Sequence, residues 1–159
     1  RKEAMNGIYH KVGIQATAEK IFNALTTQSG LAGWWTHEVT GAFSGGHSRP
    51  GETIRFGFGR LGSMEMEVDE LSRERKVRWE CKKGPEDWIG SHIEFTLEKS
   101  STNDQMTIVY FNHQDWKKES EFMGHCSMKW AVFLLSLKSL IEKGEGNPSP
   151  NDVKIDDWN

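Results

Sequence analysis

A chain of 159 residues with 36% hydrophobic and 27% charged residues has the composition of a globular protein and the length of one domain. Its net charge of −3, without a dense basic stretch, argues against DNA or RNA as a partner. The longest uninterrupted apolar block, residues 130–135, is far shorter than the about 20 residues of a membrane span. Residues 1–6 show no signal-peptide pattern. We therefore predict a single cytoplasmic domain over residues 1–159 that neither crosses a membrane nor binds nucleic acid.

The N-terminal part of the chain is predicted to form a strand followed by two short helices. Residues 8–14 alternate between apolar and polar positions, which is typical of a strand. Apolar residues at steps of three and four over residues 18–25 indicate an amphipathic helix with Thr17 as its N-cap. Thr27 is suited to cap a second, shorter helix over residues 28–32, which ends shortly before two adjacent tryptophans.

Six further segments alternate between apolar and polar residues, and short turns rich in glycine, proline or small polar residues separate them. A period of two predicts strands, because successive side chains of a strand point to opposite faces. The last segment is apolar on both faces, which indicates a strand in the interior of the sheet. The predicted strands are residues 35–40, 53–58, 64–69, 76–81, 93–98 and 106–111.

The longest helix is predicted near the C-terminal end, over residues 122–141. Apolar residues recur there at steps of three and four along one broad stripe, and Lys129 and Lys138 belong to the polar remainder. Gly144 is the expected left-handed cap that ends this helix. Residues 145–159 carry two prolines and several acidic residues, so we expect an extended tail over the surface.

These elements predict an α+β domain with one curved antiparallel sheet. Strands joined by hairpin-length turns form such a sheet, and its apolar face needs a cover. The C-terminal helix is the one element long enough to provide it. A sheet of about seven strands twists and curls. We therefore expect the sheet to wrap around that helix, in the chain order β-α-α-β6-α, and to leave a cavity between the two layers.

The side chains predicted to face this cavity are mostly large and apolar, as in small-molecule sites generally. For most of them taken singly, core packing is the simpler interpretation. Their common position between a curved sheet and a helix favours a cavity, and two methionines would give it an adaptable wall. The predicted pocket residues are Trp35, Phe56, Phe58, Met64, Met66, Trp79, Phe95, His113, Cys126, Trp130 and Phe133.

The polar residues show no pattern of a catalytic or metal site. No histidine pair has the spacing of metal ligands, and neither a nucleophile motif nor paired carboxylates occur, so no metal, cofactor or catalytic residue is predicted. His113 follows a strand face that carries Val109 and Phe111, and it either hydrogen-bonds a loop or orients a ligand at the pocket mouth. Cys81 and Cys126 are interpreted as reduced thiols of a cytoplasmic protein, while a disulfide between them stays open.

Several stretches of the sequence resemble one known group of proteins. They are residues 18–25 with the following tryptophan pair, 51–56, 88–97, 113–116, and the helix with its end at 144–148. The chain resembles the START and Bet v 1-like (SRPBCC) superfamily, and more narrowly the bacterial proteins related to the C-terminal domain of the activator of Hsp90 ATPase. This resemblance implies the helix-grip fold. The chain departs from the family pattern at residues 44–50, where its longer and more polar loop is expected to change the pocket mouth.

The resemblance implies a fold more directly than a function, because the superfamily includes lipid carriers, hormone receptors and cyclases. The first hypothesis is a monomeric or homodimeric protein that binds a small hydrophobic or aromatic molecule between sheet and helix. The second, implied by the resemblance alone, is an Hsp90-linked stress or co-chaperone interaction protein. The third is a polyketide cyclase-like enzyme in which His37 or His113 moves a proton. The lack of a catalytic motif in the sequence favours a function without catalysis.

Overall fold

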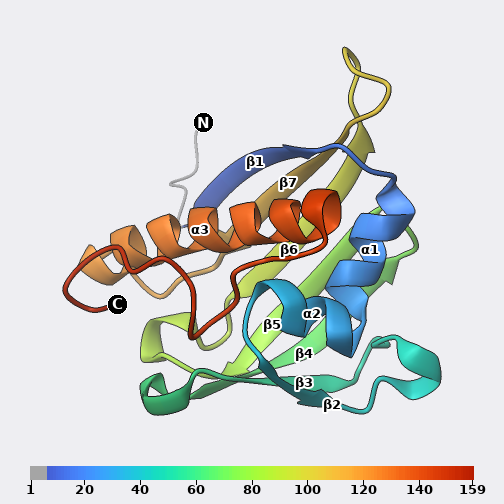
Figure 1. Cartoon of the computed structure of the whole chain (residues 1–159). Helices are drawn as coiled ribbons and strands as arrows, with labels where there is room; N and C mark the ends of the chain where they lie inside the picture. The colour runs from blue at the N-terminus through green and yellow to red at the C-terminus, as the bar shows by residue number, and fades with distance from the viewer. Residues whose placement is uncertain (1–6) are drawn as a thin grey trace, which may run out of the picture.

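The computed structural model describes residues 7–159 and arranges them as one curved sheet with helices on its inner side (Figure 1). The sheet has seven strands in the order β1-β7-β6-β5-β4-β3-β2, and every pairing is antiparallel. This α+β architecture confirms the helix-grip prediction. The elements are β1 (Ile8–Ile14), α1 (Ala18–Thr26), α2 (Gln28–Trp34), β2 (Glu38–Gly41), η1 (Ser44–Gly46), β3 (Thr53–Gly57), η2 (Gly59–Leu61), β4 (Ser63–Ser72), β5 (Lys76–Lys83), η3 (Glu86–Trp88), β6 (His92–Lys99), β7 (Thr107–Gln114) and α3 (Glu121–Lys143).

The sheet bends around α3, which packs against β1 at one side and against α1 and α2 at one end (Figure 1). The pairing of β4 with β5 shifts register between Glu65 and Met66 and again between Val68 and Glu70. Such irregularities bend a strand and increase its local twist. None of the helices among residues 7–159 has the length and apolarity needed to span a bilayer.

Alternation along the strands decides which side chains enter the core. On β5, Val77, Trp79 and Cys81 are fully buried. On the outer face of the same strand, the Lys76 ammonium lies 3.3 Å from a Glu70 carboxylate oxygen of β4. An exposed pair of this kind contributes at most about 1 kcal/mol, whereas burying one large apolar side chain contributes about 1.5 to 3 kcal/mol. The inward face therefore provides most of the stabilisation.

The helix ends follow the predicted capping residues. The Thr17 hydroxyl accepts a hydrogen bond from the Lys20 amide (3.3 Å), and the Thr27 hydroxyl accepts one from the Gly30 amide (3.1 Å). Gly144 ends α3 with φ of 85°, a conformation that glycine adopts without steric cost. These three local predictions are confirmed.

The structure differs from the prediction at the tryptophan pair, where a strand was expected from residue 35. Instead α2 continues through Trp34, and Trp35 still has helical dihedral angles as its C-cap. The two indoles stack with centroids 5.9 Å apart, and both are buried. The strand β2 begins only at residue 38. The apolar residues here are buried at the end of a helix. Alternation of apolar and polar residues alone does not distinguish such a helix end from the start of a strand.

The tail 145–159 runs back along α3 and is tied to the body by polar contacts (Figure 1). Ser149 forms a parallel bridge with Thr36, and its amide donates to the Trp35 carbonyl (2.8 Å). Asp152 forms a buried ion pair with Lys129 of α3. The sequence assigned Lys129 to the polar face of the helix; the structure instead buries it under the tail, because Asp152 supplies the opposite charge.

His113 occupies a polar position inside the core. Its Nδ1 accepts a hydrogen bond from the Trp130 indole nitrogen (3.1 Å), and its Nε2 lies 2.8 Å from the Ser91 hydroxyl. An indole N–H can only donate, so Nδ1 carries no proton and the neutral ring donates from Nε2 to Ser91. Burial, with a smaller effect of His92, lowers the pKa of His113 from 6.5 to about 3. His113 therefore links α3 to the sheet as a neutral side chain.

This burial gives a prediction about pH. Because the unfolded His113 binds a proton below pH 6.5 and the folded one does not until about pH 3, stability is lost as the pH falls through this window. The His113 contribution to the slope is at most about 1.4 kcal/mol per pH unit. The free energy of unfolding, measured with urea at about pH 5 and about pH 7, should therefore differ less between the two pH values for His113→Gln than for the wild type. The exposed His37 serves as control, and a His113→Gln slope equal to that of His37→Gln would contradict the assignment.

Candidate functional site

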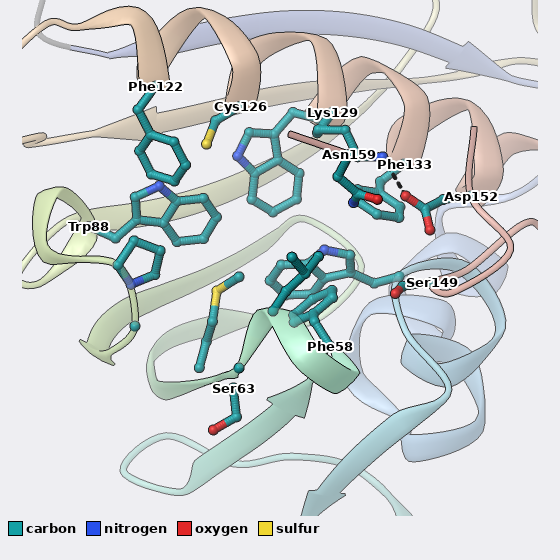
Figure 2. Close-up of a pocket in the computed structure, with 17 residues that line it drawn as sticks. Phe58, Ser63, Trp88, Phe122, Cys126, Lys129, Phe133, Ser149, Asp152 and Asn159 are labelled. Atoms are coloured by element: carbon teal, nitrogen blue, oxygen red, sulfur yellow. Dashed lines mark hydrogen bonds and ion pairs between the residues drawn. The ribbon is translucent and has the colours of Figure 1, made fainter. Parts of the chain in front are cut away.

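A cavity of about 480 Å³ lies between the first half of α3, the loops at one end of the sheet, and the C-terminal tail (Figure 2). Its position agrees with the sequence-based expectation of a gap between helix and sheet. The residues that line it are Trp35, Phe58, Leu61, Gly62, Ser63, Met64, Gly84, Pro85, Trp88, Phe122, Cys126, Lys129, Trp130, Phe133, Ser149, Asp152 and Asn159.

One wall of the cavity is a single face of α3. Residues Phe122, Cys126, Lys129, Trp130 and Phe133 follow the three- and four-residue steps that place side chains on one side of a helix. Trp130 is 2% exposed, and Phe133 is 6% exposed. The amphipathic pattern that makes the helix pack onto the sheet therefore also forms this wall.

The remaining large surfaces are aromatic rings from three separate parts of the chain, Trp35, Phe58 and Trp88. The Trp35 ring lies 5.1 Å from Trp130 and 5.6 Å from Phe58, measured between centroids. Trp88, from the turn between β5 and β6, stacks on Trp130 at 6.0 Å with an interplanar angle of 15°. Figure 2 shows Trp88 and Phe122 together at one end of the cavity. Flat rigid walls of this kind suit apolar or aromatic guests.

The opposite end of the cavity is polar. Figure 2 shows Lys129 and Asp152 paired there, with Ser149 beside them. The Lys129 ammonium also donates to the Val153 carbonyl (2.8 Å) and lies 5.3 Å from the centroid of the Phe133 ring. Burial by itself raises the pKa of Asp152, but hydrogen bonds from Lys129 and from a second lysine of the tail lower it overall. The carboxylate therefore stays ionised at neutral pH.

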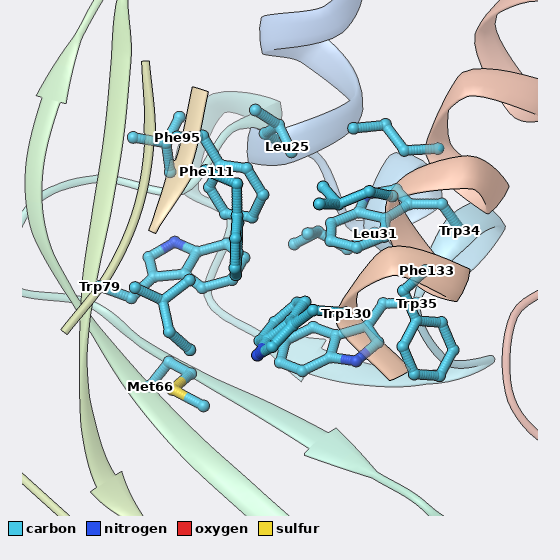
Figure 3. Close-up of a cluster of buried hydrophobic side chains, with 14 of the residues drawn as sticks. Leu25, Leu31, Trp34, Trp35, Met66, Trp79, Phe95, Phe111, Trp130 and Phe133 are labelled. Carbon is cyan, nitrogen blue, oxygen red and sulfur yellow. The ribbon is translucent and has the colours of Figure 1, made fainter. Parts of the chain in front are cut away.

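The predicted pocket residues divide into two groups. Trp35, Phe58, Met64, Cys126, Trp130 and Phe133 line the cavity. The others lie in the solid core behind it, where Figure 3 shows several of them in one cluster. For example, Trp79 packs edge-on against Phe95 at 5.4 Å. The side chains placed in the core and not on the cavity wall are Phe56, Met66, Trp79, Phe95 and His113.

Several lining residues were not predicted from the sequence. Trp88 and Phe122 carry a usable signal, since Trp88 is a large aromatic in the turn between two predicted strands and Phe122 is one at the start of the predicted long helix. The two glycines and Pro85 line the cavity because of how their turns fold. The tail residues line it because the tail runs back past the cavity, which the sequence does not indicate. The lining residues that the prediction omitted are Leu61, Gly62, Ser63, Gly84, Pro85, Trp88, Phe122, Lys129, Ser149, Asp152 and Asn159.

The thiols near the site are suppressed as nucleophiles. Burial raises the pKa of Cys126 to about 12 and that of Cys81 to about 11, so both remain protonated at neutral pH. The Trp88 N–H has no hydrogen bond of standard geometry, but it lies close enough to the Cys126 thiol to oppose the rise in pKa. Both cysteines are free. Among residues 7–159, no cluster of three or more histidine, cysteine, aspartate or glutamate side chains could hold a metal ion.

The polar loop 44–50 does not reach the cavity, although the sequence associated it with the pocket mouth. It packs beside α1, where the His47 ring nitrogen Nδ1 lies 2.9 Å from the Thr26 hydroxyl. Ser48 is 2% exposed, and its amide donates to the Thr26 carbonyl (2.8 Å). The loop instead lines a separate groove with α1 and the turn between β4 and β5, and this groove shares no lining residue with the cavity.

Comparison with known structures supports the fold and the family. The solution structure of the Aha1 dimer from Colwellia psychrerythraea is 42% identical to this chain, covers 89% of it and 100% of its own chain, and superposes with a TM-score of 0.78. CalU16 from Micromonospora echinospora is 18% identical, with coverages of 91% and 77% and a TM-score of 0.64. DynU16, a putative protein of the dynemicin biosynthetic locus, is 17% identical, with coverages of 90% and 49% and a TM-score of 0.71.

The similarity to CalU16 and DynU16 shows a shared fold and nothing more. A comparison with curated proteins found no match. The family described as Activator of Hsp90 ATPase homolog 1-like protein matches residues 15–142, which include six of the seven strands, all but β1, and nearly all of α3. The chain therefore belongs to the activator of Hsp90 ATPase homolog 1-like family.

Proposed function

We propose that this protein binds a small hydrophobic or aromatic molecule in the cavity between the sheet and α3. The observation that carries the proposal is the aromatic-walled space of about 480 Å³, which lies within the about 300 to 1,000 Å³ typical of ligand sites. Trp35, Trp88 and Trp130 supply flat walls, and Met64 supplies a flexible one. The fold is shared with CalU16 and DynU16 and does not identify the guest.

The geometry gives little support to a cyclase-like enzyme. His113, the proton carrier considered from the sequence, is fully buried behind Trp88 and Trp130 with its pKa lowered to about 3. His37 is not among the residues that line the cavity and lies only in the adjoining hollow beside the tail. The lining residues are better suited to holding a molecule than to moving a proton.

Filling the cavity tests the binding proposal. In Cys126→Trp an indole projects from α3 into the space that a guest would occupy. We expect the neutral dye N-phenyl-1-naphthylamine to fluoresce with the wild type and to bind at least about tenfold more weakly to this variant, equivalent to about 1.4 kcal/mol. Met128→Trp is the matched control, because Met128 is 57% exposed on the outer face of the same helix. A wild type that retains neither the dye nor any lipid in native mass spectrometry would contradict the proposal.

We infer that Hsp90 interaction is the second candidate function, on the support of the family match and of the 42% identical Aha1 structure. The free, buried cysteines are consistent with the reducing cytoplasm in which such a partner would be met. This candidate needs an exposed contact surface and does not need an occupied cavity.

An ATPase assay separates the two candidates. If the protein acts on Hsp90, it should raise the rate of ATP hydrolysis by a purified Hsp90, and the cavity-filling Cys126→Trp variant should raise it equally. An unchanged rate at saturating concentrations of the wild type would exclude this function. Bovine serum albumin at the same concentration controls for non-specific stabilisation of the ATPase.

We also propose that two copies of the chain associate through the outer face of α3. The support is the dimeric state of the Colwellia relative and two apolar side chains on that face, Met128 at 57% and Leu135 at 59% exposure. They are seven residues apart, so they lie on one side of the helix, with the small Ala131 between them. Two such faces related by a two-fold axis are self-complementary, with Met128 of one copy opposite Leu135 of the other.

A charge on this face tests the dimer. The wild type should elute with twice its 18.2 kDa mass in size-exclusion chromatography with light scattering, and Leu135→Glu should elute as a monomer, because it would bury a carboxylate against an apolar side chain. Val153→Glu, a change at a residue of equal exposure on the tail, should remain dimeric. A dimeric Leu135→Glu would show that the contact lies elsewhere.

A further inference from the structure

The cavity continues into a second hollow of about 370 Å³ beside the tail. The two share lining residues, among them Phe58, Leu61 and Ser149, so they adjoin directly. The hollow has fewer aromatic walls than the cavity, and its lining includes the side chains of Arg60, Lys154, Glu38 and His37. A single guest can therefore meet aromatic walls at one end and charges at the other.

Two polar groups at this junction can still donate hydrogen bonds, the Lys129 ammonium and the Ser149 hydroxyl, while Glu38 in the hollow keeps one carboxylate oxygen without a partner among residues 7–159. Lys129 uses two of its three ammonium protons, on Asp152 and on the Val153 carbonyl, and one remains. The Ser149 hydroxyl makes no hydrogen bond within residues 7–159, although Ser149 is only 7% exposed. Asp152, the one carboxylate in the cavity lining, already accepts from Lys129 with one oxygen and from Lys154 with the other (3.0 Å). A guest that reaches Lys129 and Ser149 can therefore bind both through an acceptor group.

The balance of side-chain charge at the junction is also positive. Lys129, Lys154 and Arg60 carry positive charges, against the negative charges of Asp152 and Glu38. Arg60 forms no ion pair within the described part of the chain. This local excess stands out in a protein whose net charge is −3. Charge-assisted hydrogen bonds from ammonium and guanidinium groups to an anion are about twice as strong as neutral ones.

We propose that the guest is an amphipathic anion. Its apolar or aromatic body occupies the cavity, and its single acidic group, a carboxylate or a sulfonate, lies at the junction within reach of Arg60, Lys154 and the free proton of Lys129. This inference rests on the proposed binding function and adds the charge of the ligand to it. Neutral apolar molecules of the same shape fit the cavity but leave the buried donors of Lys129 and Ser149 without partners, which costs binding energy.

Two dyes with the same aromatic body test the inference. 8-Anilinonaphthalene-1-sulfonate and N-phenyl-1-naphthylamine differ by one sulfonate group. In the double variant Arg60→Gln with Lys154→Gln, we expect the Kd of the sulfonate dye to rise about fivefold while that of the neutral dye changes less than about twofold. Raising the salt from about 0.05 M to about 0.5 M should weaken the sulfonate dye selectively in the wild type. Both mutated side chains are exposed, so the fold should be unaffected.

The matched control removes two lysines far from the site, Lys20→Gln with Lys99→Gln, which changes the net charge of the protein by the same amount and should leave both Kd values unchanged. Cys126→Trp should weaken both dyes, which would place them in the same cavity. The anion preference would be overturned if the Kd of both dyes changed equally in the double variant of Arg60 and Lys154. It would also be overturned if the control variant lost sulfonate binding to the same extent. Either result would leave the binding function standing. A wild type that binds neither dye would overturn both.

Discussion

The packing of Trp130 against the sheet is the interaction on which the rest of this structure depends. Its ring lies 4.6 Å from Phe111 of β7 and 5.1 Å from Trp35 at the end of α2, and its N–H donates to His113. Trp130 of α3 thus contacts the sheet, the end of α2 and the buried His113. Loss of a buried tryptophan of this kind typically costs about 3 to 5 kcal/mol, so the position of α3 is closely specified.

The cavity is a consequence of the same arrangement. A curved sheet touches a straight helix along only part of its length, and near the β5–β6 turn the two surfaces separate. Large rigid rings such as Trp88 and Phe58 line the gap without filling it. The tail closes one side, because its buried Asp152 is held by Lys129. Removing either partner of a buried ion pair would leave an uncompensated buried charge, and here the pair forms the polar end of the cavity.

Family membership and site chemistry answer different questions about this protein. The match to the Hsp90 activator family and the 42% identical Colwellia structure establish what the chain is related to. Fold relatives as different as CalU16 and DynU16 share the architecture at low identity. The proposals about a guest therefore depend on the residues of this chain: aromatic walls at one end, and free donors beside Lys129 and Ser149 at the other.

The sequence by itself determined the order of the helices and strands, the caps at Thr17, Thr27 and Gly144, and the inward face of clearly alternating strands such as β5, because these depend on local periodicity and capping chemistry. It also identified Trp130, Phe133 and Cys126 as one helix face. Only the tertiary structure decided that Phe56, Met66, Trp79 and Phe95 lie in a solid core, while Trp88, Lys129 and Asp152 line the cavity. The reason is that alternation predicts which face of the sheet a side chain occupies, but it does not predict the distance between the sheet and α3. That distance is set by contacts between residues far apart in the chain.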